Sequence, residues 1–252
     1  HYYIGLSDEY DLGIKFLIKK DPWDIQLAFF KNADWGNPSD LDRYSTDIVT
    51  DSSISQGNEE TNQFNLRLAR IFEHSEKNET EIGVSGMIGQ LYNSITTDMG
   101  DRWAAAVHLN GYYGPFNLML EGAWYDFNPE NPAGVDNSTV LLGNFGSSYL
   151  LASEGVMYTA NVSYDLPVSW GPITKLTFFN DYNILVKNKE GFSDSEMNIP
   201  GVMLTAGPVL VYMSAIMGKN AIFLGNETEP MGAGNPDAVW NVRYNINVGY
   251  YF

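Results

Sequence analysis

Three histidines, His1, His74 and His108, are the residues of this chain best suited to acid–base or metal chemistry. Nucleophilic catalysis needs a base within hydrogen-bond reach of a hydroxyl and a third group that orients the base. The sequence places no serine or aspartate beside His108 in this way. Zinc sites draw on histidine and cysteine, and the chain has no cysteine. We therefore expect no catalytic residue, no metal and no cofactor, and a protein that is not an enzyme.

Charged side chains of both signs recur at every second position of several segments. In a soluble protein they would form an ordinary solvated face. Inside a closed barrel they would set the electric field of a narrow aqueous space. We predict that a pore is lined by Lys15, Arg67, Arg102, His108, Glu121, Lys175, Asp181 and Arg243. We expect a modest ion preference, and a lower anion permeability when Arg102 or Arg243 is replaced by alanine.

The segments that carry these residues alternate between apolar and polar positions, which predicts strands with two unlike surroundings. The clearest segment runs from Trp240 to Phe252. It is longer than the roughly five or six residues usual in soluble proteins, and it suits the roughly nine to eleven that cross a bilayer. The alternation recurs at 11–19, 23–30, 102–113, 116–125, 155–164 and 175–186. It is weaker at 62–74 and 80–92, where Arg70 falls on the apolar face.

Short and long connections follow one another along the chain, as in membrane barrels with short periplasmic turns and long extracellular loops. The short joints are Asp21-Pro22, 76–79, Gly114-Pro115, 169–172 and Gly207-Pro208. The long ones are 34–61, 93–101, 128–152, 188–198 and 220–237, and they hold most of the acidic residues. Aromatic residues collect at the ends of the apolar rows, as in interfacial girdles: Trp23, Trp103, Tyr113, Phe116, Trp124, Trp240 and Tyr250.

Two segments need separate interpretation. The uncharged run Met197–Gly218 is long enough for a membrane helix, but Pro200, Gly201 and the Gly207-Pro208 turn favour two strands. Ser138–Ser153 is also uncharged and rich in leucine and aromatic residues, and exposing it to water is unfavourable. It folds into the lumen, packs against a neighbouring subunit or extends the flanking strands, three alternatives that the sequence leaves open.

These segments give about eleven strands from near Tyr10 to Phe252. The first and the last both run toward the short turns, whereas bacterial barrels have an even number of strands and an open edge is not viable in lipid. We expect one all-β domain over 1–252, a transmembrane antiparallel up-and-down barrel with about 11–12 strands in this chain. The remaining strand is compressed into His1–Leu6, or the chain is the C-terminal part of a larger barrel, which we favour.

Composition narrows the class of protein further. The formal net charge of −17 argues against nucleic acid as a partner, because that affinity rests on basic side chains. Aromatic residues make up 14% of the chain and charged residues only 18%, unlike disordered acidic chains.

The last strand also carries a resemblance. Ile246, Val248, Tyr250 and Phe252 resemble the C-terminal signature of Gram-negative outer-membrane proteins, and the hairpin Lys15–Phe30 looks like strand pairs of the general porin superfamily. The resemblance implies an outer-membrane channel for passive diffusion of small hydrophilic solutes or ions. It implies outer-membrane lipids, lipopolysaccharide and the barrel assembly machinery as partners, with a homotrimer as a candidate oligomer. A plugged structural or partner-binding barrel is the alternative, and an outer-membrane enzyme ranks below it.

Deletion of Phe252 should reduce insertion into the outer membrane in cells, because the residue ends the apolar row that the assembly machinery reads in such proteins. The amount of protein at the cell surface measures the effect. Normal surface levels of the truncated chain would contradict this assignment.

Overall fold

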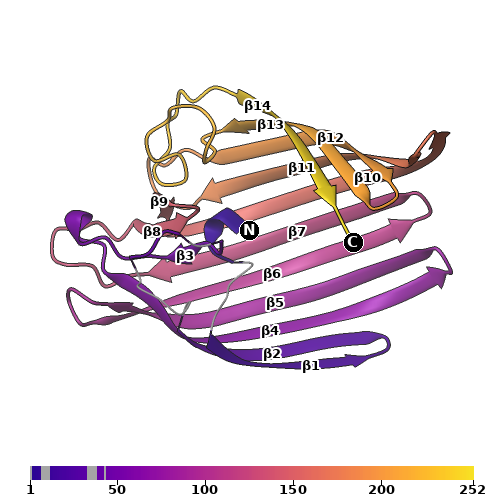
Figure 1. Cartoon of the computed structure of the whole chain (residues 1–252). Helices are drawn as coiled ribbons and strands as arrows, with labels where there is room; N and C mark the ends of the chain where they lie inside the picture. Colours follow the sequence, from indigo (N-terminus) through magenta and orange to yellow (C-terminus); the bar gives the residue numbers. More distant parts are fainter. Residues whose placement is uncertain (1, 7–11, 33–38, 43) are drawn as a thin grey trace.

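The computed structural model describes residues 2–6, 12–32, 39–42 and 44–252, so His1 and Tyr10 lie outside the described residues. The described chain is almost entirely antiparallel β-structure (Figure 1). The strands of the main sheet are β1 (Leu12–Lys20), β2 (Trp23–Asn32), β4 (Asn58–Ser75), β5 (Asn78–Asn93), β6 (Met99–Tyr113), β7 (Phe116–Asn128), β10 (Glu154–Trp170), β11 (Ile173–Lys187), β12 (Ser195–Ala206), β13 (Val209–Lys219) and β14 (Asn241–Tyr250).

The eleven strands pair with their neighbours in chain order, which confirms the predicted all-β, antiparallel, up-and-down sheet. Within the described residues the sheet stays open, because β1 pairs with β2 alone and β14 pairs with β13 alone. β1 ends at the Asp21-Pro22 turn, and β14 ends beside Gly207-Pro208, where the Tyr251 N–H donates to the Pro208 carbonyl at 2.9 Å. The two edge strands therefore run in the same direction.

The short joints all lie at one end of the sheet, and the long connections lie at the other (Figure 1). Gly114, Gly171 and Gly207 each have a φ near +60° and each precedes a proline. A positive φ followed by the fixed φ of proline gives a type II′ turn, whose twist matches that of the paired strands. Glycine reaches this φ without steric cost. The predicted rhythm of short turns and long connections is confirmed.

The register keeps the two faces separate across the sheet. One cross-strand row on the convex face consists of Ile14, Phe29, Phe64, Ile88 and Trp103. The neighbouring row on the concave face consists of Lys15, Ala28, Asn65, Met87 and Ala104. A slip of one residue between two strands would exchange the faces, so the alternation in the sequence specifies the register. The aromatic residues predicted as girdles are all exposed.

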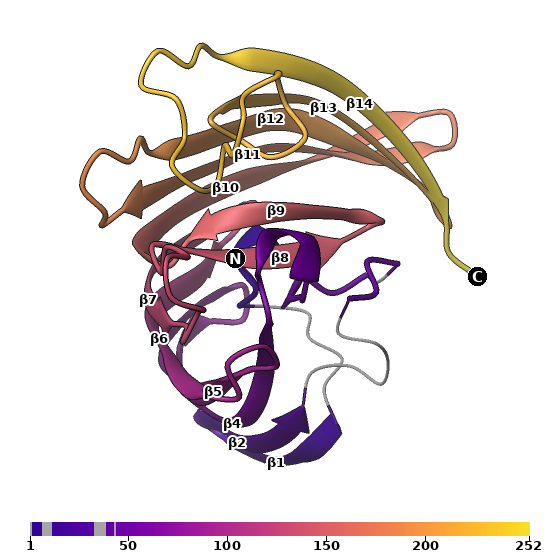
Figure 2. The ribbon, with the colours of Figure 1, turned by 90° about the vertical axis from the view of Figure 1, so that its left-hand side faces the viewer.

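A small second sheet lies inside the curve of the main sheet (Figure 2). We call it the inner cap: β3 (Asp47–Ile48), β8 (Thr139–Asn144) and β9 (Ser147–Ala152), with the short 3-10 helices η1 (Tyr2–Ile4) and η2 (Ser52–Ile54). Val140, Leu142 and Leu151 of the inner cap share one buried cluster with Tyr125 and Phe127 of β7. Of the three alternatives for 138–153, the structure shows the segment folded onto the concave face, because apolar residues of β7 on that face pack against it.

Hydrogen bonds fasten the inner cap at several points. The Tyr125 hydroxyl donates to the Ala152 carbonyl at 2.9 Å, and the Tyr149 hydroxyl donates to the Tyr3 carbonyl at the same distance. The buried Asn144 amide donates to the Thr46 hydroxyl at 2.7 Å. These hydrogen bonds pair polar groups whose burial without a partner would destabilise the fold. No helix among the described residues is long and apolar enough to cross a membrane, and Met197–Gly218 forms parts of β12 and β13 as predicted.

Leu151→Ala should lower the free energy of unfolding by about 2–5 kcal/mol, because it leaves a cavity between the inner cap and the sheet. Leu151 is fully buried, whereas Leu17, on the concave side of β1, is 59% exposed and is the matched control. Urea unfolding in detergent micelles, followed by tryptophan fluorescence, measures both variants. Equal losses for Leu151→Ala and Leu17→Ala would contradict the packing described.

Candidate functional site

Arg67 on β4 is the centre of a charged ladder that crosses the concave face. Its Nη1 lies 3.0 Å from Asp24 on β2, and its Nη2 lies 2.6 Å from Glu81 on β5. Lys19 on β1 approaches Asp24 at 3.9 Å, and His108 Nε2 on β6 lies 3.1 Å from Glu81. The charged ladder therefore joins five neighbouring strands through basic side chains, carboxylates and the His108 ring.

The sheet register explains why these groups meet. Lys19, Asp24, His108 and Glu121 belong to one cross-strand row, and small residues, Ala69 and Gly83, fill the two positions between Asp24 and His108. The small side chains leave room for Arg67, one row away, to reach both Asp24 and Glu81. A Cβ added at Gly83 would lie 2.4 Å from the His108 ring, so a larger residue would displace the ring from this approach.

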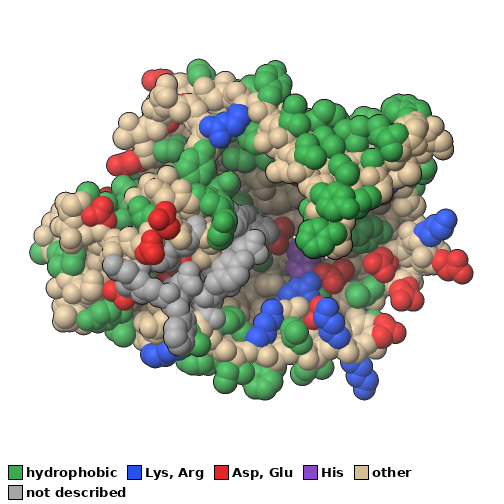
Figure 3. Space-filling view, in the orientation of Figure 1, with side chains coloured by type: hydrophobic (Ala, Val, Ile, Leu, Met, Phe, Trp, Pro, Cys, Tyr) green, Lys and Arg blue, Asp and Glu red, His purple; other side chains and the backbone are tan. Residues whose placement is uncertain are grey.

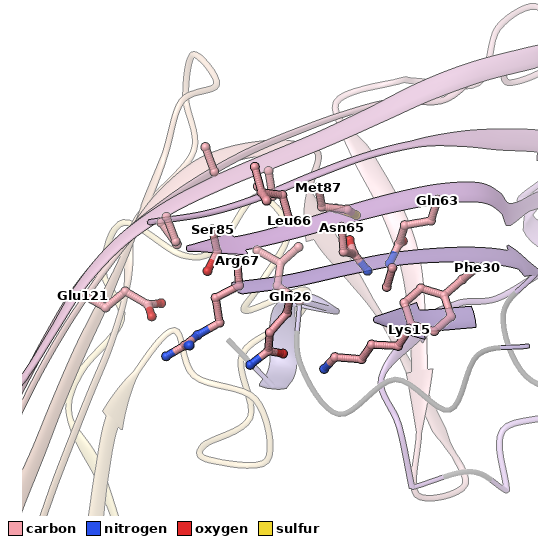
Figure 4. A pocket seen from close by; sticks show the side chains of 17 residues that line it. Lys15, Gln26, Phe30, Gln63, Asn65, Leu66, Arg67, Ser85, Met87 and Glu121 are labelled. Atoms are coloured by element: carbon pink, nitrogen blue, oxygen red, sulfur yellow. The ribbon is translucent and has the colours of Figure 1, made fainter. Parts of the chain in front are cut away.

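A cavity of about 330 Å³ lies next to the charged ladder on the concave face. Lys15, Gln26, Arg67 and Glu121 point into it from four strands (Figure 4), and Leu6 of the N-terminal segment also lines it. The space-filling view shows basic, acidic and histidine side chains gathered at the same hollow (Figure 3). Fixed charges of both signs in a confined aqueous space can orient small polar solutes and ions of either sign.

The predicted residues of β11 and β14 lie on the concave side but outside the charged ladder. Lys175 pairs with Asp165 of β10 at 2.9 Å, near the Gly171-Pro172 turn. Asp181 is half-buried in the middle of β11. Arg243 donates to the Phe223 carbonyl at 2.8 Å, and it counteracts the rise in the pKa of Tyr3 that burial of the phenol causes. The structure therefore brings Lys15, Arg67, His108 and Glu121 together and leaves these three apart.

Arg102 was predicted to line a pore, but the structure buries its side chain. Its side chain points to the concave side but is 2% exposed. It forms an ion pair with Glu60 at 2.5 Å and donates a hydrogen bond to Gln63, both on β4, and it lies over the Phe127 ring. Arg102 thus fastens β4 to β6 at the loop end and does not line open space. Its replacement is therefore expected to act on folding stability.

The residues of the predicted assembly signal lie on the free edge of the sheet. Ile246, Val248 and Tyr250 point to the convex face of β14, each more than 60% exposed, and Phe252 follows the end of the strand. The Tyr250 and Phe252 rings stack with centroids 6.3 Å apart. The predicted signal therefore lies along a backbone edge that no other described strand pairs with.

Glu81 and Glu60 contact predicted site residues and were themselves missed by the sequence prediction. Glu81 belongs to β5, where Gly83, Gly86 and Gly89 interrupt both rows and weaken the alternation. Glu81 and Ser85 lie an even number of positions apart along the strand and therefore share one face. This spacing was the available signal that Glu81 points to the concave face. Glu60 lies in a segment predicted as loop, because β4 extends farther toward the loop end than the alternation indicated.

Comparisons with known proteins add no family to this geometry. No protein-family model matches the chain, no curated protein is detectably similar to it, and no solved structure matches its fold. Among the described residues, no group of three or more histidine and acidic side chains is arranged to hold a metal ion.

Arg102→Met should lower the free energy of unfolding by about 3–5 kcal/mol, because it leaves the buried Glu60 carboxylate without its cation. The double variant Arg102→Met with Glu60→Gln should recover a large part of that loss, because no buried charge remains unpaired. Urea titration of both variants and of Glu60→Gln gives the coupling energy. Additive losses in this double-mutant cycle would show that the ion pair is energetically unimportant.

Proposed function

We propose that the sheet forms the wall of an outer-membrane β-barrel through which small hydrophilic solutes or ions diffuse. The observation that carries the proposal is the two-faced register: apolar side chains on the convex face and the charged ladder on the concave face. A membrane barrel requires this arrangement, with lipid outside and water inside.

The convex face supports a lipid surrounding. Its exposed side chains include Phe16, Leu66, Ile88, Val107 and Ile246, distributed from one edge of the sheet to the other. A soluble monomer rarely exposes so wide an apolar surface. Outward charges such as Asp126 and Glu154 lie at strand ends, where a bilayer gives way to water. Lipid contact along the strand centres accounts for both features.

Closure of the barrel is constrained by strand direction. β1 and β14 run the same way, so their direct pairing would be parallel. Antiparallel closure therefore takes an odd number of additional strands between β1 and β14, which gives the even total found in bacterial barrels. Such strands would also pair the backbone groups of both edges, which hydrocarbon cannot solvate.

A plugged barrel is the second candidate, and the inner cap favours it. The inner cap fills the loop half of the concave face through a buried cluster that includes Leu91, Met157 and Leu185 of the main sheet. Such a barrel would anchor a partner or stabilise the envelope. In a pore, the same inner cap narrows the entrance and leaves passage beside the charged ladder.

Arg67→Gln should shift the reversal potential in a salt gradient, with the anion-to-cation permeability ratio falling about twofold. The change removes a cation from the lumen and frees the charges of Asp24 and Glu81. Single-channel recording in planar bilayers measures both conductance and reversal potential. Lys77→Gln, which removes the same charge in the exposed β4–β5 turn, is the control and should not shift the reversal potential.

The two candidate functions separate in the same recordings. An absence of conductance from membrane-inserted wild-type protein would refute the pore and leave the plugged barrel. Conductance with equal reversal potentials in wild type and Arg67→Gln would remove the charged ladder from the permeation path.

A further inference from the structure

Arg70 is out of place on the apolar convex face. It belongs to β4, five residues before Ser75, and lies in one outward row with Lys20, Trp23 and Ile82. The row is close to the Asp21-Pro22 turn and therefore to the short-turn end of the sheet (Figure 1). Both Lys20 and Arg70 are exposed.

Two aromatic rings hold the Arg70 guanidinium in place. Its Cζ lies 5.3 Å from the Trp23 ring centroid and 4.9 Å from the Phe72 ring centroid. Contacts of this kind attract a cation without neutralising it. They orient the planar donor group, whose remaining N–H groups are free to meet an oxyanion.

Neither cation of this row takes part in an ion pair with another described residue, because the ion pairs of the sheet use other groups. Glu73 and Glu79, on the nearby ends of β4 and β5, are cross-strand neighbours in a concave row and do not face these cations. Among the described residues, the outward row of Lys20, Trp23, Arg70 and Ile82 therefore holds two cations and no anion.

We infer that Lys20, Trp23, Arg70 and Phe72 form a binding site for the phosphate of an anionic phospholipid in the leaflet on the short-turn side. Arginine matches phosphate oxygens through two parallel N–H donors, and lysine adds a second charge. Trp23 sits at headgroup level, and the acyl chains lie along Ile18, Ile25 and Leu68 of the same strands. The inference rests on the proposed membrane location.

Site-directed quenching tests this site, because the chain has no cysteine of its own. A fluorophore on Ile82→Cys reports the row of Arg70, and one on Val162→Cys reports the convex face of β10. Each labelled protein is placed in phosphatidylcholine vesicles that contain brominated phosphatidylglycerol or brominated phosphatidylcholine. At Ile82→Cys, the anionic lipid should be favoured about fivefold, as one well-placed cation at a membrane surface implies. At Val162→Cys, the two lipids should quench equally.

Arg70→Gln should reduce the preference at Ile82→Cys to the level at Val162→Cys, and Arg70→Lys should keep most of it. Lys77→Gln, the matched loss of charge in the neighbouring turn, should leave it unchanged. Equal quenching by the two lipids at both labels, or a preference that survives Arg70→Gln, would overturn the lipid site while the barrel stands. An absence of quenching by either lipid at both labels would overturn the proposed function itself.

Discussion

The separation of an apolar face from a charged face across a single sheet is the constraint on which the rest of the structure depends. Alternate side chains of each strand face opposite sides, so an apolar convex face and a charged concave face are possible only when all strands keep one register. The rows that contain Ile14 and Lys15 hold this register from β1 to β6. The type II′ turns support it, because each fixes the pairing of the two strands that it joins.

The concave face is divided between two kinds of interaction. Toward the loops, apolar residues such as Tyr125 and Leu91 bury the inner cap, and Arg102 is enclosed with Glu60. Toward the turns, Ala69 and Gly83 occupy little volume on the concave face. The long charged side chains beside them can therefore extend across the sheet and form the charged ladder next to the cavity. The buried cluster therefore lies in the loop half of the concave face, and the charged ladder and its cavity lie in the turn half.

Alternation and turn chemistry were sufficient to predict the sheet and its strand order, because these depend on neighbours in sequence. For the same reason Arg67 and Glu121 lie on the concave face as expected, and their role in lining a pore stays a prediction. The burial of Arg102 was not predictable, since it depends on Glu60 and Phe127 and on the inner cap, which distant segments build. Glu81 was missed because glycines blur the alternation of β5. Arg70 interrupts the apolar alternation in the sequence, and in the structure it lies on the convex face as the alternation predicted. Cation–π contacts with Trp23 and Phe72 stabilise the guanidinium there.

We propose that the convex face meets lipid and that the concave face meets water. Neighbouring residues of β5 test it most directly: Val84 points to the convex face, and Ser85 points to the concave face at the cavity. Single cysteines at these positions, in a chain with none of its own, are exposed to a membrane-impermeant maleimide after insertion into vesicles. If lipid covers the convex face, Ser85→Cys is labelled rapidly and Val84→Cys is protected. Equal labelling of both cysteines, or the reverse order, would contradict the lipid-facing assignment of the convex face.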